Sequence, residues 1–266
     1  MCSSDLIRPD GYRYYLNFLR FQIRHTGLLR LDHIMGLYRL YWIPKGFPAS
    51  KGAYVRYPAE ELFAILCLES HRHKTALIGE NLGTVPPEVN AAMDQHKINR
   101  MFVVQYEQRP DPRKALRPPA RECIASMNTH DMPTFSSYWN GLDIPDRAEL
   151  GILNQNRIAS TKKLRRKANN ALVQFLRHKR LVPPKGRVAD NQVLSACLKF
   201  LAASKARFLL INLEDLWSET VPQNTPGTTS ERRNWRHKGR LALEQIKTSQ
   251  HLRAILAEID RLRRKG

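Results

Sequence analysis

Short apolar segments alternate with helical patterns along this chain. Five of the segments have the length of a strand, and several are apolar at nearly every position, as expected for strands buried on both faces of a sheet. They cover residues 28–32, 75–80, 101–106, 123–128 and 208–213. Because the alternation of strand and helix is typical of a parallel sheet covered by helices, the chain is predicted to be an α/β protein.

Apolar residues at helical spacing mark the intervening helices. Residues 12–25 and 58–74 each predict a helix, and the second has acidic residues in its first turn and basic residues in its last, which complements the helix dipole. Residues 144–190 are predicted to be a helical insertion before the last strand. Residues 240–264 predict a C-terminal helix with an apolar stripe.

The composition is that of a globular protein with a strong basic bias. The chain has 266 residues, is 42% hydrophobic and carries a formal net charge of +20. Residues 146–190 hold 12 Lys and Arg against 3 Asp and Glu, and residues 231–266 hold 11 against 4. This charge leaves open a nucleic-acid-binding protein, in which basic and aromatic residues would alternate on one surface.

Cysteine spacing and the apolar runs bear on the compartment. The four cysteines are far apart, which predicts neither a disulfide framework nor a zinc site. No apolar run reaches the length of a membrane-spanning helix, and the N-terminus lacks a secretory pattern. We therefore expect a cytoplasmic protein.

A carboxylate stands at the end of three predicted strands. Asp32, Glu80 and Asp131 hold these positions. In a parallel barrel the carboxyl ends of all strands meet at one mouth, so that acids distant in sequence converge there. This suits glycosidic chemistry, in which one carboxylate is the nucleophile and a second the acid and base. Arg30 shares a strand face with Asp32 and can orient it. Taken singly, each carboxylate is more simply explained as a helix cap or an ion-pair partner.

The residues around these carboxylates form longer motifs in a fixed order: RLDHIMGL (30–37), GAYV (52–55), IGENLGTVP (78–86), THDMPT (129–134), YW (138–139) and ETVPQNTPGT (219–228). Together they resemble the 4-alpha-glucanotransferases called amylomaltase or disproportionating enzyme, in the alpha-amylase superfamily. The resemblance begins near Pro9 and corresponds to the C-terminal portion of that family. Asn81 and Arg233 depart from it, since the family often shows Asp and Pro at these positions.

The resemblance implies a partial (β/α)8 TIM barrel. It would comprise about strands 4 to 8, with the helical insertion at residues 144–190 before strand 8 and the C-terminal helix at residues 240–264. Residues 9–266 would form this C-terminal part of a catalytic barrel. Residues 1–8 are expected to be a non-native or disordered N-terminus, and the first three strands would lie outside the chain.

The resemblance also implies roles for individual residues. Asp32 would be the nucleophile that forms a covalent glycosyl-enzyme, Glu80 the general acid and then base, and Asp131 the third acid, which stabilises the transition state. Substrate binding would fall to three further residues: Arg30, His130 and Asn224.

The implied activity is transfer of 4-alpha-glucan segments between maltooligosaccharides by a retaining double displacement. The expected partners are maltooligosaccharides and alpha-1,4-glucans, with no nucleic acid and no membrane, and neither a cofactor nor a metal is required. Two alternatives stay open: a truncated, inactive fragment of such an enzyme, and a basic nucleic-acid-binding protein. The sequence does not indicate an oligomeric state.

Overall fold

The chain falls into two compact units, which are described one at a time. The computed structural model describes residues 8–264. Unit 1 comprises residues 1–101 and 122–124, and unit 2 comprises residues 102–121 and 125–266. The N-terminus predicted at residues 1–8 lies outside the described residues, except for Arg8, which pairs with Glu61.

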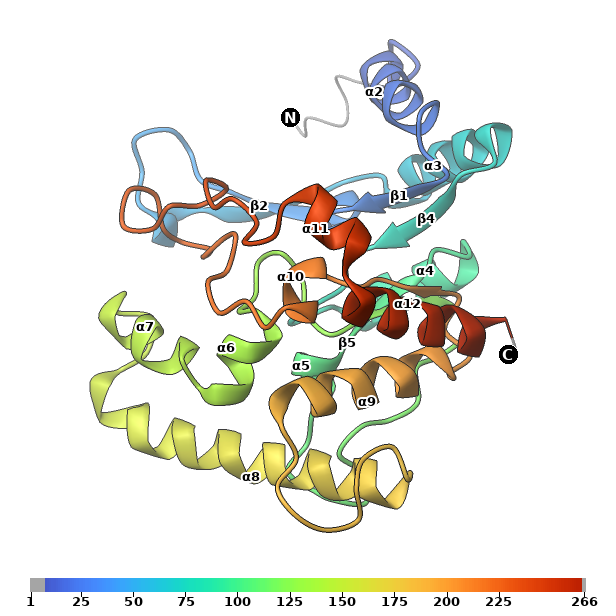
Figure 1. Ribbon diagram of the computed structural model, residues 1–266. Helices are drawn as coiled ribbons and strands as arrows, with labels where there is room; N and C mark the ends of the chain where they lie inside the picture. Colours follow the sequence, from blue (N-terminus) through green and yellow to red (C-terminus); the bar gives the residue numbers. More distant parts are fainter. Residues whose placement is uncertain (1–7, 265–266) are drawn as a thin grey trace. The chain divides into compact units, whose positions relative to one another are not determined.

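Unit 1 contains a parallel strand pair covered by helices. Strand β1 pairs with β4 in the register Leu28↔Ala76 to Leu31↔Gly79 (Figure 1). The elements in chain order are α2 (Arg13–Ile23), β1 (Leu28–Leu31), η1 (Ile34–Leu37), β2 (Arg39–Trp42), η2 (Ala49–Lys51), β3 (Ala53–Arg56), α3 (Ala59–His73), β4 (Ala76–Gly79) and α4 (Pro87–Gln95). The predicted strands at residues 28–32 and 75–80 and the predicted helices at 12–25 and 58–74 are therefore present.

The end of β4 packs closely against the core of unit 1. Phe63, Met93 and Ile34 are almost fully buried. A Cβ atom at Gly79 would come within 2.8 Å of Met93 and 2.9 Å of Ile34. Because glycine has no Cβ atom, the strand end can approach the core at this position. This close packing places the backbone of the next residue, Glu80.

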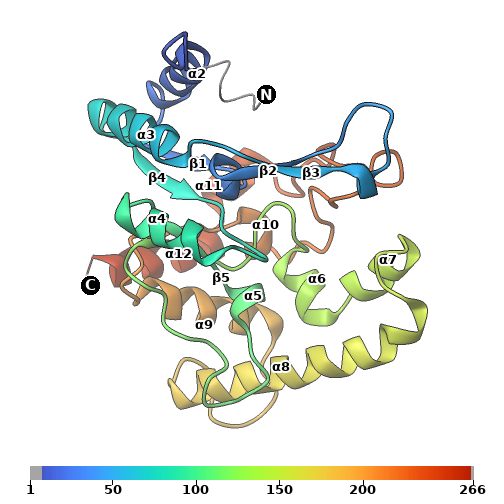
Figure 2. The ribbon, with the colours of Figure 1, turned by 180° about the vertical axis from the view of Figure 1, so that it is seen from behind.

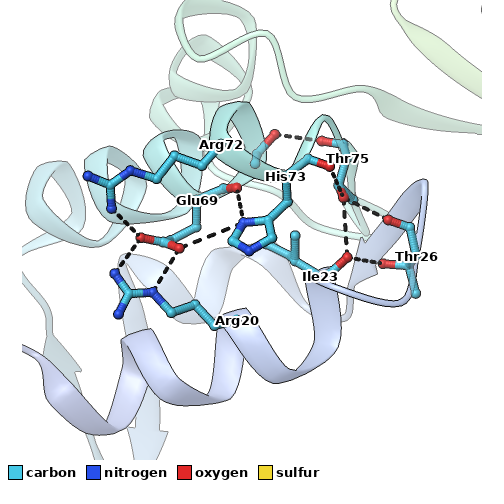
Figure 3. Close-up of polar contacts among 8 residues, drawn as sticks. Arg20, Ile23, Thr26, Glu69, Arg72, His73 and Thr75 are labelled. Atoms are coloured by element: carbon cyan, nitrogen blue, oxygen red, sulfur yellow. Dashed lines mark hydrogen bonds and ion pairs between the residues drawn. The ribbon is translucent and has the colours of Figure 1, made fainter.

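A buried carboxylate joins α2 to α3. Glu69 on α3 is completely buried, and its two oxygens accept hydrogen bonds of 2.9 Å from the Nε and Nη2 atoms of Arg20 on α2 (Figure 3). Arg72 Nη1 donates a further 2.9 Å bond. Beside this cluster, the hydroxyl of Thr75 donates to the carbonyl of Thr26 at 2.7 Å. The helix pair is thus held by an ion-pair cluster and by a neutral hydrogen bond.

An antiparallel hairpin was not predicted from the sequence pattern. Strands β2 and β3 pair in the register Arg39↔Arg56 to Trp42↔Ala53. Tyr41 and Tyr54 face each other across the hairpin with ring centroids 5.1 Å apart. Both rings are about half exposed. The strand sequences RLYW and AYVR do not alternate between apolar and polar residues, which is the pattern that marks a half-buried strand.

Unit 2 is mostly helical. Its elements, with β5 and β6 having residues in both units, are β5 (Arg100–Val103), α5 (Val104–Glu107), β6 (Cys123–Ser126), α6 (Phe135–Asn140), α7 (Asp143–Glu149), η3 (Gln155–Arg157), α8 (Ile158–His178), α9 (Asp190–Ala202), β7 (Phe208–Leu209), α10 (Leu213–Leu216), α11 (Leu243–Thr248) and α12 (Gln250–Arg263). The strand order is β5-β6-β7. Helix α9 lies between α8 and α12 (Figures 1 and 2).

Three predicted elements differ from those observed. The apolar run at residues 101–106 divides into β5, which ends at Val103, and α5, which begins at Val104. The run at 208–213 holds a strand of two residues, followed by α10. The predicted helix at 240–264 is two helices, α11 and α12, and the hydroxyl of Ser249 caps the second by accepting from Leu252 N. Short apolar runs do not separate strand from helix by periodicity, which explains the first two differences.

The observed elements make an α/β protein, as predicted. The helical insertion predicted at 144–190 corresponds to α7 and α8, with α7 beginning at Asp143. Within residues 8–264, no helix combines the length and the apolar character needed to cross a membrane.

Candidate active site

Asp32 and Glu80 occupy adjacent positions in unit 1. Asp32 directly follows β1 and Glu80 directly follows β4, and the strands are in register up to the pair Leu31↔Gly79. Glu80 N donates to Leu31 O at 2.8 Å, and Ile34 N donates to Glu80 O at 3.1 Å. Since paired strands lie about 4.8 Å apart, the structure brings these two carboxylate residues side by side although 48 positions separate them.

Arg30 contacts Asp32 on the same strand face. The Arg30 Nη2 atom lies 2.7 Å from Asp32 Oδ1. The Asp32 side chain is 75% exposed, so the carboxylate is open to an approaching ligand. Arg30 Nε is buried and has no hydrogen-bond partner among residues 8–264. A buried donor of this kind is a group that a ligand or an ordered water can satisfy.

Two backbone amides orient the Glu80 carboxylate. Its Oε2 atom accepts from His33 N at 3.0 Å, and its Oε1 atom accepts from Leu82 N at 2.7 Å. His33 has φ 46°, in the left-handed region that non-glycine residues seldom adopt. This turn comes directly after Asp32. This local conformation therefore affects both carboxylates. It follows the end of β1, where Asp32 lies, and it directs the His33 amide toward Glu80.

In unit 2, Asp131 contacts the two other predicted binding residues. Its Oδ1 accepts from Asn224 Nδ2 at 2.6 Å, across 93 positions of sequence. Its Oδ2 lies 3.1 Å from His130 Nε2. The His130 ring is 5.5 Å from the Trp235 ring, centroid to centroid. The structure thus gathers His130, Asp131 and Asn224 and adds Trp235, which the sequence analysis missed.

Asp131 and Asn224 line a cleft of about 820 Å³ within unit 2. Tyr138, Pro222 and Arg232 are among its other lining residues. The lining mixes apolar residues with several acidic and basic ones, and a cleft of this volume is in the range that holds a small ligand. The unit therefore has space for sugar residues beside Asp131.

A buried ion pair supports one wall of this cleft. The Nη1 and Nη2 atoms of Arg165 each donate to Asp143 at 3.0 Å, and the guanidinium lies 3.5 Å from the centre of the Tyr138 ring. Burial raises the pKa of the Tyr138 hydroxyl. The sequence analysis considered the surrounding basic segment, residues 146–190, only for its net charge. The signal that marks Arg165 as different is its helical spacing from the buried residues Asn169 and Leu172.

The two residues that depart from the family pattern have different surroundings. Asn81 Nδ2 donates to Asn90 Oδ1 at 2.9 Å, and Asn81 Oδ1 accepts from Met101 N at 3.0 Å. An ionised Asp at this position would lose the first of these bonds because it has no donor. Arg233 lines the cleft of unit 2.

The six predicted site residues divide between the units. Arg30, Asp32 and Glu80 lie together in unit 1, and His130, Asp131 and Asn224 lie together in unit 2. Among residues 8–264, no three His, Cys, Asp or Glu side chains are arranged to hold a metal ion.

Fold and site together define a class. Polar sites at the carboxyl ends of parallel strands are characteristic of catalytic α/β domains. The 4-alpha-glucanotransferase family model (Glyco_hydro_77) matches residues 1–243, so the chain belongs to the 4-alpha-glucanotransferase family.

The sequence is also similar to individual 4-alpha-glucanotransferases. The chain is 34% identical over 264 residues to the 4-alpha-glucanotransferase of Haemophilus influenzae, an alignment that covers 97% of this chain and 38% of the relative. It is 33% identical to that of Mycobacterium bovis, over 87% of this chain and 33% of the relative. The chain therefore spans little more than a third of the length of these relatives.

Solved structures are similar to the chain as well. The crystal structure of amylomaltase from Corynebacterium glutamicum matches with a TM-score of 0.83 and 26% identity, over 95% of this chain and 38% of the other. Amylomaltase from Streptococcus agalactiae, in complex with acarbose, matches with a TM-score of 0.73 and 17% identity, over 99% of this chain and 46% of the other. The second match is one of fold alone.

Proposed function

We propose that this chain contributes the reacting carboxylates of a retaining 4-alpha-glucanotransferase, with Asp32 as nucleophile and Glu80 as acid and base. The observation that carries this proposal is the adjacency of the two residues after paired parallel strands. Retaining glycosidic chemistry uses two carboxyl groups about 5–5.5 Å apart. The spacing of neighbouring strands, about 4.8 Å, is of this order.

In the proposed first step, Asp32 attacks the anomeric carbon of the donor. Glu80 gives its proton to the glycosidic oxygen as the bond to the leaving glucan breaks, and a covalent glycosyl-Asp32 forms. In the second step, Glu80 removes the proton of an acceptor 4-hydroxyl, which attacks the same carbon and releases Asp32. Two carboxyl groups therefore balance the proton and the electron pair of each step, and the reaction needs neither a cofactor nor a metal.

The remaining site residues would bind and orient the sugar. Arg30 is positioned to orient Asp32, as its 2.7 Å contact suggests. Asp131, with His130 and Asn224 beside it, would bind sugar hydroxyls and stabilise the positive charge that develops at the anomeric carbon. The cleft that Asp131 lines supports this role.

We also infer that the fold is part of a (β/α)8 barrel. The order of neighbouring strands is β1-β4 and β5-β6-β7, and a parallel bridge joins Ile78 of β4 to Asn99, the residue before β5. Neighbours in chain order are the pattern of a singly wound barrel. In this reading the strands are the fourth to the eighth, and residues 144–190 are the insertion before the last of them.

The proposed substrates are maltooligosaccharides and alpha-1,4-glucans. The names of the relatives and the acarbose complex of the Streptococcus agalactiae amylomaltase support this class. The domain limits, the cytoplasmic location and the absence of nucleic-acid and membrane partners stay predictions.

The test is turnover of maltotriose by the purified chain. We expect glucose and longer maltooligosaccharides to form, and Asp32→Asn or Glu80→Gln to reduce turnover by roughly 10³-fold or more, as loss of a reacting group does. Glu60→Gln is the matched control in unit 1, because the Glu60 side chain is 72% exposed. A wild-type chain without turnover would refute the proposal and favour the alternative of an inactive fragment.

A further inference from the structure

Asp215 is a buried carboxylate in unit 2 that the proposed reaction does not use. It lies on α10 and is 3% exposed. Among residues 8–264, no Lys or Arg forms an ion pair with it. Its partners are the side-chain amide of Asn128 and the backbone amide of Phe135, and both belong to the segment that carries His130 and Asp131.

The two partners stand at the two ends of residues 128–135. Asn128 Nδ2 donates to Asp215 Oδ2 at 3.0 Å and to Oδ1 at 3.3 Å, while Phe135 N donates to Oδ1 at 2.7 Å. One carboxylate thus closes the segment into a loop. Asn128 and Phe135 are both buried. The contact is therefore shielded from water, where hydrogen bonds to a charged group are strong.

Further bonds orient the loop but do not replace this contact. The Asn212 side chain donates to Asn128 Oδ1, which leaves Asn128 Nδ2 directed at Asp215. Gln105 Nε2 donates to Pro133 O at 3.0 Å. Within the loop, Asp131 N donates to the Thr129 hydroxyl at 3.3 Å. Residues 128–134 belong to no helix or strand, so side-chain bonds determine where Asp131 meets Asn224: those to Asp215 at the two ends, the bond from Asn128 Nδ2 to Pro133 O at 3.3 Å, and the bond from the Thr134 hydroxyl to Glu219 O.

We propose that Asp215 is a positioning residue, whose carboxylate holds the loop 128–135 so that Asp131 and His130 project into the cleft at a fixed place. The proposal deepens the proposed function and rests on it for the role of Asp131. A carboxylate suits the position because all three contacts come from N–H donors. An asparagine would offer one acceptor oxygen and would turn its own amide hydrogens toward those of Asn128.

Ionisation of the buried Asp215 carboxyl group costs folding free energy. The residue is therefore better explained by a role in positioning the loop than by a contribution to stability. Burial raises the pKa of Asp215 to about 6, against the opposing effect of the Phe135 and Asn128 hydrogen bonds. Perturbed carboxylates of this kind are frequent near functional sites.

The test compares three variants of the whole chain: Asp215→Asn, the double variant Asp215→Asn with Asn128→Asp, and Glu214→Gln as control. In the double variant the donor and acceptor of this contact exchange places, because an aspartate at 128 accepts from the new amide at 215 and still accepts from Asn212. The bond of 3.3 Å from Asn128 Nδ2 to Pro133 O is lost, so we expect restoration of most of the effect. The asparagine oxygen at 215 remains available to Phe135 N. The control changes the adjacent acid on α10, which contacts Gln223 instead of the loop.

Two readouts are measured, amide hydrogen exchange of residues 128–135 and the kcat and KM for maltotriose. We expect Asp215→Asn to accelerate exchange of this loop by roughly 10-fold or more while α8 and α9 keep their protection, and to lower kcat by a similar factor with a smaller change in KM, as loss of a charge-assisted hydrogen bond predicts. The double variant should restore most of both values, and the control should match the wild type.

Several outcomes would overturn the proposal. Unchanged exchange in Asp215→Asn, or failure of the double variant to restore the loop, shows that the pairing does not hold it. Equal loss of protection in α8 and α9 in both variants shows that Asp215 supports the whole unit instead. A wild-type chain without turnover refutes the proposed function, and the exchange measurements then still decide whether Asp215 positions the loop.

Discussion

Two buried carboxylates, one in each unit, have opposite surroundings. Glu69 in unit 1 accepts bonds from two arginines, and its hydrogen bond with Arg20 is the main reason why its pKa lies below the usual range. Among residues 8–264, the donors to the Asp215 side chain are uncharged, and burial raises its pKa to about 6. Both side chains are almost inaccessible to solvent, but Asp215 lies deeper in the protein than Glu69. Depth and bonding partners together thus set the direction of the pKa shift of a buried acid.

The opposite shifts predict opposite effects of pH. A lowered pKa gives stability that is present above the unfolded pKa and lost as pH falls through the folded one. A raised pKa means that the folded state binds a proton more tightly than the unfolded state, so that stability increases as pH falls through the folded pKa toward the unfolded one. Glu69 and Asp215 should follow these two rules respectively.

The largest effect is expected from a third buried carboxylate. It tests whether the bonding partner, or the unit in which the residue lies, determines the contribution to stability. Asp143 lies in the same unit as Asp215 but is paired with an arginine, as Glu69 is. Asp143→Ala leaves Arg165 buried without a counter-ion, so we expect the free energy of unfolding to fall by about 3–5 kcal/mol in urea denaturation. Asp260→Ala, which breaks the exposed pair with Arg264, should change it little. Equal losses in both variants would contradict the comparison.

The next effect concerns the pH dependence that Asp215 causes. Between pH 7 and pH 4, the wild type should gain stability relative to Asp215→Asn by on the order of 2–3 kcal/mol, since one pKa unit corresponds to about 1.4 kcal/mol. Urea denaturation of both proteins at several pH values measures the difference. Glu214→Gln should keep the sign of the slope and reduce it only slightly, because the Glu214 charge is the smallest of the causes that act on the Asp215 pKa. A difference that is flat across this range would show that the carboxylate is not held at a raised pKa.

A smaller effect of opposite sign is expected at Glu69. Glu69→Gln should lower the free energy of unfolding by about 2 kcal/mol at pH 7, because hydrogen bonds to charged groups contribute about this much. The deficit should shrink as pH falls below about 4.5, the ordinary pKa of a glutamate, since the wild-type carboxylate then becomes protonated. Glu60→Gln on the same helix is the exposed control. A deficit that grows on acidification would be the wrong sign.

The smallest effect is expected from the neutral hydrogen bond between Thr75 and Thr26, which lies beside the Glu69 cluster. It distinguishes the effect of the Glu69 charge from that of this uncharged contact. Thr75→Val removes the buried hydroxyl that donates to Thr26 O, so we expect a loss of about 1 kcal/mol that does not vary with pH between 4 and 7. Thr26→Val is the matched control, because its exposed hydroxyl donates to the carbonyl of Gln22 at 3.2 Å. Thermal denaturation at two pH values suffices. If the loss of stability in Thr75→Val depended on pH, the pH effect would belong to the Thr75 and Thr26 contact and not to the Glu69 carboxylate.

Prediction from sequence worked best where the contact is local. The alternation of a strand places Arg30 and Asp32 on one face, and the 2.7 Å contact between them agrees. The apolar runs at 28–32 and 75–80 also predicted the strands β1 and β4, whose pairing the structure adds. The same reasoning was wrong for residues 101–106, where a strand gives way to a helix at Val104, because a short apolar run suits both.

Prediction failed where a contact depends on closure of the chain over long distances. The hairpin β2–β3 and the ring of Trp235 beside His130 carry no periodic signal that separates them from surface residues. Helical spacing marks the buried face of Arg165 but does not reveal Asp143 as its partner. The left-handed turn at His33, which supplies an amide to Glu80, is likewise invisible in the sequence because any residue type can be forced into it by its surroundings.

The sequence by itself determined the α/β class, the strand ends that carry Asp32 and Glu80, and the family motifs around the three acids, because strand periodicity and motif order are written in neighbouring residues. Asp131 was expected at a strand end, but β6 ends at Ser126 and Asp131 lies in the loop that follows. Only the tertiary structure decided that Asp32 and Glu80 are adjacent, that Asn224 binds Asp131 across 93 positions, and that Asp215 holds the two ends of the loop that carries Asp131. These contacts join distant segments, and their geometry follows from which surfaces the folded chain buries together.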